Sequence, residues 1–283
     1  MNDSNFPEQH TKEPQSESGI KPEISCIILF TICFWGGCLD FSFHLIRGGN
    51  FPQAYVYPKH LRATRDLLRR RTSIVRHGAD LKAHVVNTTS QYNLPPNKVN
   101  LKNLCAREQL KHTFDEPSAQ KSIDLDMAIL DCYQQELSKI EWYIEQQTKQ
   151  FKSAEVCLLR SIPGVGKILS LTILLEIGDI ERFPNVQKFA SYCRLVKCKA
   201  ESAGKSYGTQ GNKIGNAHLK WAFSEAAVLY LRGNPSAQKY LQRLQKRMSK
   251  AKALSALAHK IGRAVFFMLK NKTVFDEQRF LHR

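Results

Sequence analysis

The stretch SIPGVGKILSLTILLEIGDI, Ser161–Ile180, breaks one helical pattern sharply and starts another. A proline and two glycines fall within Ile162–Gly166, and an apolar helical pattern follows directly. Pro163 sets its own φ, while the glycines allow positive φ and a close approach of the backbone to another surface. This spacing predicts a helix-hairpin-helix, in which one helix ends over Val156–Ser161 and the next runs over Lys167–Ile177.

Two interpretations of this predicted hairpin compete. The amides that open a helix lack partners within it, so they can donate to a phosphate, and Lys167 adds positive charge there. In the other interpretation, the turn is an ordinary connection between two helices and its glycines serve packing alone. The charge of the whole chain favours the first, so Gly164, Gly166 and Lys167 are candidate DNA contacts.

The chain is strongly basic, with 42 Lys+Arg against 25 Asp+Glu and a net charge of +17 over 283 residues. Such an excess is typical of proteins that bind a polyanion, either nucleic acid or an anionic membrane surface. Apolar residues at 42% and aromatic residues at 10% indicate a folding chain rather than a disordered basic tail. From Arg232 to the C-terminus, the only acidic residues in the sequence are Asp276 and Glu277, so positive charge is concentrated there.

The 8 cysteines are scattered and none forms a CxxC pair. Structural zinc usually needs two closely spaced ligand pairs, and Cys193 and Cys198 have no second pair nearby, so no metal site is predicted. Scattered cysteines are typical of reduced thiols, and we expect a cytoplasmic protein.

An apolar run, CIILFTICFWGGCL at Cys26–Leu39, follows a polar segment that reads as a disordered tail. The run is too short to cross a bilayer core comfortably, so no membrane partner is predicted. A membrane anchor, a buried strand or helix, and a segment without a native role are the three interpretations of this run.

Two long helical patterns follow, over Tyr57–Val86 and Ile123–Phe151. In the second, apolar residues recur every seven positions, at Ile123, Leu130, Leu137 and Ile144. A stripe of this kind favours pairing with one partner helix. The simplest partner is the first helix, in an antiparallel hairpin, and the alternative is a second copy of the protein.

The first of these helices carries arginines on its outer face: Arg62, Arg65, Arg69, Arg70, Arg71 and Arg76. A run of charge is often only a solvated face, but it also suits a helix that lies along phosphates. On the second interpretation, Arg69, Arg70 and Arg71 are candidate DNA contacts.

The stretch CKAESAGKSYGTQGNKIGNAHLKWAF, Cys198–Phe223, predicts a glycine-rich loop with hydroxyls and cations, followed by a helix from about Ala217. It lacks the order of a P-loop, so nucleotide binding is not predicted. A serine needs an activating neighbour to act as a nucleophile, and Lys205, Lys213 or His218 could supply charge. A cap or turn role is the alternative for any serine in such a loop.

Three stretches together carry a family resemblance: SIPGVGKILSLTILLEIGDIERFPNVQKFASYCRLV, ESAGKS, and GNKIGNAHLKWAFSEAA. They resemble the C-terminal domain of the insertion-sequence one-ten and eleven-eleven transposases, the bridge-RNA-guided DNA recombinases. The similarity runs from about Gly48 to Phe280. The PGVG motif alone would not be specific, but the set is.

The resemblance implies a mechanism. Members of the family have an N-terminal RuvC-like domain whose four acidic residues hold Mg²⁺, a coiled coil, and a helical domain with a serine. That serine attacks DNA and forms a covalent phosphoserine intermediate, while paired subunits and a structured guide RNA select the sites. Ser202 of ESAGK is the matching position in this chain, and Ser206 is the competing candidate.

The chain departs from the family pattern at its N-terminus. The resemblance places a D-x-x-D motif where this chain has Trp35 and Cys38, and Asp40 is out of register. Two metals cannot be held for phosphoryl chemistry without the acidic residues, so no cofactor is expected for this chain itself. We therefore expect a truncated copy that does not cleave DNA alone.

The predicted fold class is mostly α: a long antiparallel helical hairpin, forming a coiled-coil linker, and then a compact helical domain containing the helix-hairpin-helix. Residues 1–46 are predicted to be a tail with an unrelated or degenerate apolar segment. Residues 47–157 hold the edge of the nuclease domain and the coiled-coil helices, and residues 158–283 form the transposase domain. DNA, a guide RNA and a second copy bound through the coiled coil are the expected partners. A DNA- or RNA-binding fragment without catalysis is the alternative function.

Overall fold

The structure is a computed structural model that describes residues 46–49, 55–94, 101, 110, 113–202, 205–210 and 215–282. For residues 198–202 and 206–210 it describes the backbone only. The chain divides into two units, Met1–Val56 and Tyr57–Arg283, and the elements below belong to the second. The apolar run at 26–39 and Lys213 lie outside the described residues.

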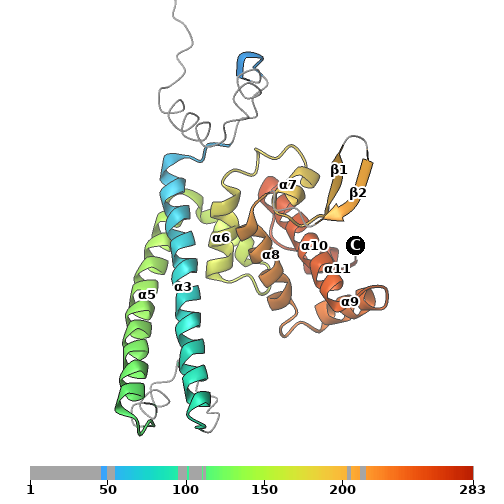
Figure 1. Ribbon diagram of the computed structural model, residues 1–283. Coiled ribbons are helices and arrows are strands. Elements are labelled where there is room, and N and C mark those ends of the chain that lie inside the picture. Colours follow the sequence, from blue (N-terminus) through green and yellow to red (C-terminus); the bar gives the residue numbers. More distant parts are fainter. Residues whose placement is uncertain are drawn as a thin grey trace, which may run out of the picture. The chain divides into compact units, whose positions relative to one another are not determined.

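The mostly α fold class predicted from the sequence is confirmed (Figure 1). The helices and strands of the described part of the second unit are α3 (Lys59–Gln91), α5 (Pro117–Arg160), α6 (Lys167–Ile177), α7 (Val186–Tyr192), β1 (Cys198–Ser202), β2 (Lys205–Gln210), α8 (Ala217–Tyr230), α9 (Pro235–Gln245), α10 (Lys250–Asn271) and α11 (Glu277–His282).

Helices α3 and α5 pack side by side and run in opposite directions (Figure 1). Arg71 Nη2 lies 2.6 Å from Glu141 Oε1, and His84 Nδ1 lies 2.5 Å from Asp126 Oδ2, so residue numbers rise on one helix as they fall on the other. The apolar seven-residue stripe of α5 supplies the buried residues Ile123, Leu130 and Ile144. In this chain the stripe therefore packs against α3.

The predicted end of the second long helix at Phe151 coincides with a kink inside α5. Lys152 has non-helical backbone angles, φ −143° and ψ 40°, and the helix resumes beyond it to Arg160. The Lys152 ammonium donates a hydrogen bond to the carbonyl of Gly178, just past the end of α6. The kink thus places a cation where α6 leaves carbonyls without helical partners.

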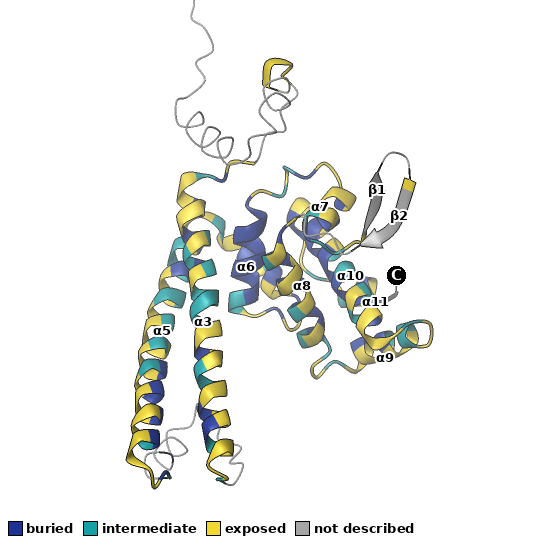
Figure 2. Ribbon diagram, viewed as in Figure 1, coloured by how far each residue is buried: buried dark blue, intermediate teal, exposed yellow. Residues whose placement is uncertain are grey.

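Helix α6 is the centre of the compact helical body, and every residue from Leu169 to Ile177 is buried (Figure 2). A helix that is apolar all round must be covered all round. Helices α5, α3 and α8 contact it, and α8 in turn packs against α10. The largest fully buried side chains of this core include Phe189, Phe223 and Tyr230.

The glycine-rich stretch predicted as a loop contains a β-hairpin, which corrects the sequence prediction. Strands β1 and β2 pair antiparallel, with Cys198 opposite Gln210 and Ser202 opposite Lys205, and an irregularity between Lys199 and Glu201. Two residues separate the strands, the connection length that tight hairpins favour. The glycines of the stretch obscured the strands because glycine is depleted in strands generally.

Candidate functional site

The predicted nucleophile lies at the tip of the β-hairpin. Ser202 is the last residue of β1 and its Cα partner across the ladder is Lys205, the first residue of β2, whose side chain is exposed. The side chains of Ser202 and Ser206 lie outside the described residues. His218, a further candidate, lies near the start of α8 and is half-buried.

On each side of the hairpin in the chain, a nearby residue is hydrogen-bonded to the helical body. Before β1, the backbone amide of Leu195 donates to the carbonyl of Ala190 at 3.0 Å, at the end of α7. After β2, the amide of Asn216 donates to the carbonyl of Tyr192 at 2.7 Å. Gly215 has φ +103°, and a Cβ there would lie 2.6 Å from the Tyr192 carbonyl oxygen, so this return requires glycine.

A buried carboxylate lies next to Asn216, at the start of α8. Glu176 of α6 is 1% exposed, although it interrupts an apolar helix. Arg69 of α3 donates to it from Nε and Nη2, at 2.7 Å each, in a bidentate pair. Asn216 Nδ2 donates to Glu176 Oε2 at 2.7 Å, the oxygen that also accepts from Arg69 Nη2. Glu176 therefore joins α3, α6 and the start of α8 at one point.

Aromatic hydroxyls extend this polar cluster. The Tyr57 hydroxyl donates to the backbone carbonyl of Glu176 at 2.6 Å and lies 3.3 Å from the Tyr192 hydroxyl. The Arg182 guanidinium lies 4.5 Å from the ring centres of both Tyr192 and Phe183, a cation–π geometry. Arg182 Nη2 also donates to the Tyr57 hydroxyl at 3.4 Å, so the segment before α7 contacts the segment before α3.

The electrostatics of the cluster follow from burial and from the paired charges. Burial would raise the pKa of Glu176, but the hydrogen bonds from Arg69 and Asn216 outweigh it and the pKa is lowered. The pKa of His218 is also lowered, first by burial and then by the nearby arginines, although Glu176 opposes this shift. Burial and the Tyr192 hydroxyl raise the pKa of Tyr57 to about 12. Glu176 is thus anionic and His218 neutral at neutral pH.

The predicted hairpin between α5 and α6 has two glycines in different surroundings. Gly164 has φ +84°, and a Cβ there would lie 2.6 Å from the backbone of Leu229 in α8. The close approach of the Gly164 backbone is to the protein itself. Gly166 is the N-cap of α6, and a Cβ there would meet nothing within 4 Å. Lys167 pairs with Glu145 of α5 at 2.6 Å.

The three candidate arginines of α3 also separate. Arg69 belongs to the buried cluster with Glu176, and Arg71 pairs with Glu141. Arg70 is exposed. Of the three, Arg70 has the surroundings expected of a residue that contacts phosphates.

Within the described ranges, no group of three or more His, Cys, Asp or Glu side chains is placed to hold a metal ion. In the same part of the chain, no helix is long and apolar enough to cross a membrane.

Sequence reasoning missed Glu176 and Asn216. A usable signal existed for the first, because Glu176 stands alone in the apolar run LTILLEI, and a buried carboxylate needs a partner. Nothing in the sequence indicates that the partner comes from α3, more than a hundred residues earlier.

Comparison with known proteins finds similarity over the helical part of the chain that contains the hairpin. Residues 156–242 match the model of the Transposase IS116/IS110/IS902 family. The chain is 29% identical over 122 residues to an uncharacterised 43.6 kDa protein of insertion element IS110 from Streptomyces coelicolor, covering 43% of this chain and 30% of that protein. It is 28% identical over 156 residues to the transposase for insertion sequence element IS1111A of Coxiella burnetii, covering 52% and 43%.

A third relative is named for a different role. The pilin gene-inverting protein of Moraxella bovis is 28% identical over 127 residues, covering 43% of this chain and 38% of that protein. In all three matches the aligned part spans less than half of the relative's own length.

Proposed function

We propose that the chain acts in DNA transposition, with the β1–β2 hairpin presenting Ser202 to a DNA phosphate, because residues 156–242 match the model of the Transposase IS116/IS110/IS902 family. The observation that supports this most is the place of Ser202 at the tip of a hairpin that is flanked on both sides by residues hydrogen-bonded to the helical body. The matched segment, 156–242, includes this hairpin and the helices that hold it.

The proposed chemistry is a transesterification. Ser202 Oγ forms a bond to phosphorus and one backbone P–O ester bond breaks, so the number of ester bonds is unchanged. The serine proton passes to a base, and the leaving oxygen takes a proton to become a hydroxyl. Lys205, Lys213 and His218 are the candidate groups that assist, and Lys205 faces Ser202 across the ladder.

The family resemblance implies Mg²⁺ for strand cleavage. The described residues offer no cluster of carboxylates that fits this ion, so no step is assigned to it here. DNA is the proposed substrate, and a structured guide RNA is a proposed partner that rests on the resemblance alone.

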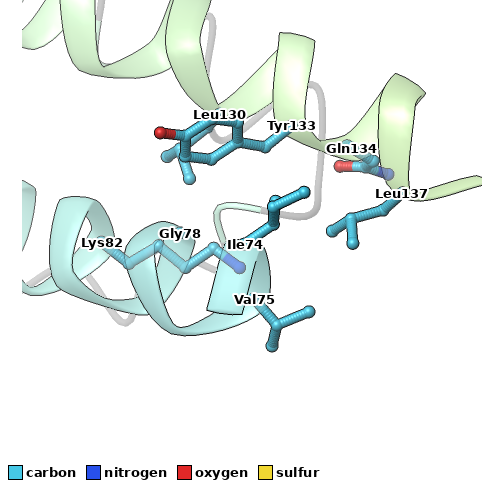
Figure 3. Close-up of a pocket in the computed structure, with 8 residues that line it drawn as sticks. All are labelled: Ile74, Val75, Gly78, Lys82, Leu130, Tyr133, Gln134 and Leu137. Carbon is cyan, nitrogen blue, oxygen red and sulfur yellow. The ribbon is translucent and has the colours of Figure 1, made fainter. Parts of the chain in front are cut away.

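Self-association is also proposed, through the groove between α3 and α5. This groove, about 380 Å³ in volume, is lined by apolar side chains including Ile74, Leu130 and Leu137 (Figure 3). Val75, at its rim, is 39% exposed. A second α3–α5 pair would cover these side chains, and sedimentation of the full chain over a concentration series tests the proposal.

The catalytic proposal is tested by trapping the covalent intermediate. The full chain is incubated with DNA bearing the ends of its insertion element, Mg²⁺, the flanking transcript and a full-length relative, and the adduct is resolved on a denaturing gel. Ser202→Ala is expected to abolish the adduct of this chain, whereas the matched control Ser206→Ala keeps it. An adduct that survives Ser202→Ala, or a DNA-linked peptide that lacks residue 202, overturns the assignment.

A further inference from the structure

We propose that Asn216 is a positioning residue for the β1–β2 hairpin, because it ties the segment between β2 and α8 through Glu176 to Arg69 of α3. We call these three residues the joint. The consequence for Ser202 rests on the proposed function, but the joint itself does not. Asn216 does not touch the reacting atoms in this proposal, and it acts only through the hairpin.

Asn216, the N-cap of α8, contacts α7 and α6 directly and is linked to α3 through Glu176. The Asn216 amide donates to the Tyr192 carbonyl of α7 at 2.7 Å, and its Nδ2 donates to Glu176 of α6 at 2.7 Å. Arg69 of α3 donates to both oxygens of the same carboxylate, so Oε2 accepts from Arg69 Nη2 as well as from Asn216 Nδ2. Asn216 is 8% exposed, so water does not replace a hydrogen-bond partner that is lost here. Asn216 lies six residues after the end of β2 and directly before α8.

The Asn216 side chain has two separable roles. Its Oδ1 accepts hydrogen bonds from the amides of His218 at 2.9 Å and Leu219 at 3.1 Å, which caps α8. Its Nδ2 donates to Glu176. Aspartate retains the acceptor that caps the helix and loses the donor, so Asn216→Asp breaks the joint while it preserves the cap.

The substitution also creates a pH dependence. It sets a second carboxylate against Glu176, and two adjacent carboxylates favour sharing one proton. A shared proton restores a hydrogen bond between positions 216 and 176 as the pH falls. The charged and titratable groups around this site are Arg65, Arg69 and Arg76 of α3, Tyr57, Arg182, Tyr192 of α7 and His218 of α8.

A reciprocal exchange gives a sharper test than either single variant. In the double variant Asn216→Asp, Glu176→Gln, the amide introduced at position 176 can donate to the carboxylate introduced at position 216. The hydrogen bond between positions 216 and 176 returns with its direction reversed, while Arg69 keeps only its hydrogen bond to the remaining oxygen at position 176, because the amide nitrogen replaces Oε2. A residue that mattered only through volume or helix capping would show no such rescue.

The experiment is hydrogen–deuterium exchange of the full chain, followed by mass spectrometry and corrected for the intrinsic effect of pH. Peptides of 198–215 report on the hairpin and peptides of 217–230 report on α8. At pH 8, Asn216→Asp is expected to speed hairpin exchange at least tenfold with α8 unchanged. Lowering the pH to about 5.5 and adding Glu176→Gln should each reverse this effect. The matched control is Asn185→Asp, which changes the N-cap of α7.

Three results would each overturn the joint. The hairpin of Asn216→Asp could exchange as slowly as that of wild type at pH 8, α8 could lose as much protection as the hairpin, or the double variant could show no rescue. The adduct assay separates the two proposals. A wild-type chain that forms no Ser202 adduct counts against the proposed function, while the exchange data still decide the joint. An adduct whose yield is unchanged by Asn216→Asp at pH 8, although exchange has risen, overturns the positioning of Ser202.

Discussion

At the residue scale, Glu176 shows how one buried charge can organise several elements. An isolated carboxylate would be too costly to bury in α6, and the hydrogen bonds from Arg69 and Asn216 offset that cost. The arrangement is directional, because a bidentate guanidinium fixes both the distance and the plane of the carboxylate. A hydrophobic side chain at this position would pack but would not specify how α3 and the hairpin return meet α6.

Glu176→Gln is expected to lower the free energy of unfolding by about 2–4 kcal/mol, because Arg69 loses a buried ionic partner. Arg69 is 38% exposed, so water recovers part of the loss and the lower end of this range is expected. The matched control is Glu136→Gln, which changes a pair with Lys139 that is exposed on both sides. Urea unfolding measures both, and equal midpoints for the two variants would contradict this account.

Acid stability gives an independent check on the same carboxylate. The pKa of Glu176 in the folded protein lies below its ordinary value of 4.5. Its ionised form therefore contributes stability that is fully present above about pH 4.5 and is lost as the pH falls through the lower folded-state pKa. The difference in melting temperature between wild type and Glu176→Gln should shrink as the pH falls below 4.5. A difference that stays constant down to pH 3 would show that the charge is not responsible.

The two glycines of the α5–α6 turn should respond differently to the same change. Gly164→Ala places a Cβ against the backbone of Leu229 at a positive φ, and a loss of at least about 2 kcal/mol is expected. Gly166→Ala enters open space at an N-cap, and its cost should stay below about 1 kcal/mol. Thermal unfolding of the two variants decides this, and a Gly164→Ala protein as stable as wild type would refute the packing role.

At the element scale, the sequence was informative where a local pattern determines the outcome. The α5–α6 turn and the bounds of α6 at Lys167–Ile177 follow from the proline, the glycines and the apolar run. The β-hairpin was missed because its strands are short and glycine-bearing, and within the described part of the chain they pair only with each other. The kink at Lys152 was anticipated only as a helix end, and the hydrogen bond that Lys152 donates there goes to Gly178, a residue far along the chain.

The same limit applied to the candidate site. The position of Ser202 came from a short motif, whereas the contacts of Asn216 and Glu176 depend on α3, α6 and α7 meeting in space. Local patterns predict elements and turns, but a polar cluster built from several distant segments has no local period to reveal it.

The α3–α5 pair offers a prediction of increased stability. Gly78 lies within α3 and lines the groove beside Leu130 and Tyr133 (Figure 3). A Cβ at Gly78 would lie 3.7 Å from Leu130 and 3.9 Å from Tyr133, which is ordinary van der Waals contact. Gly78→Ala should therefore stabilise the protein by about 0.5–1 kcal/mol through helix propensity alone.

The matched control for that change is Gly262→Ala in α10. There a Cβ would collide with the side chain of Leu195, so the same substitution in another helix must displace a neighbour. Gly262→Ala is expected to lower the melting temperature while Gly78→Ala raises it. A loss of stability in Gly78→Ala would show that the groove needs the glycine, for example to admit a second chain.

At the scale of the whole molecule, the cations behind the net charge of +17 fall into groups with different surroundings. Some cations are paired within the chain: Arg71, Lys139 and Lys149 each hold an ion pair with a glutamate of α5. Others, such as Arg243, Lys246 and Arg247 at the end of α9, are exposed. Phosphates compete poorly for a cation that already has a carboxylate, so the second group is the better candidate for nucleic-acid contact.

Affinity for duplex DNA should therefore fall steeply with salt, since each phosphate contact releases counterions. Replacing Arg243, Lys246 and Arg247 with glutamine should reduce the slope of log K against log salt by roughly one unit for each phosphate that is no longer neutralised. Replacing Arg71, Lys139 and Lys149 removes the same formal charge, yet it should change the slope much less, because each of these cations is already paired with a glutamate of α5. Fluorescence anisotropy with a labelled duplex between about 50 and about 300 mM salt measures both triple variants. Equal slopes for the two would mean that total charge, and not the exposed end of α9, governs binding, and a flat dependence for wild type would exclude phosphate contacts as the source of affinity.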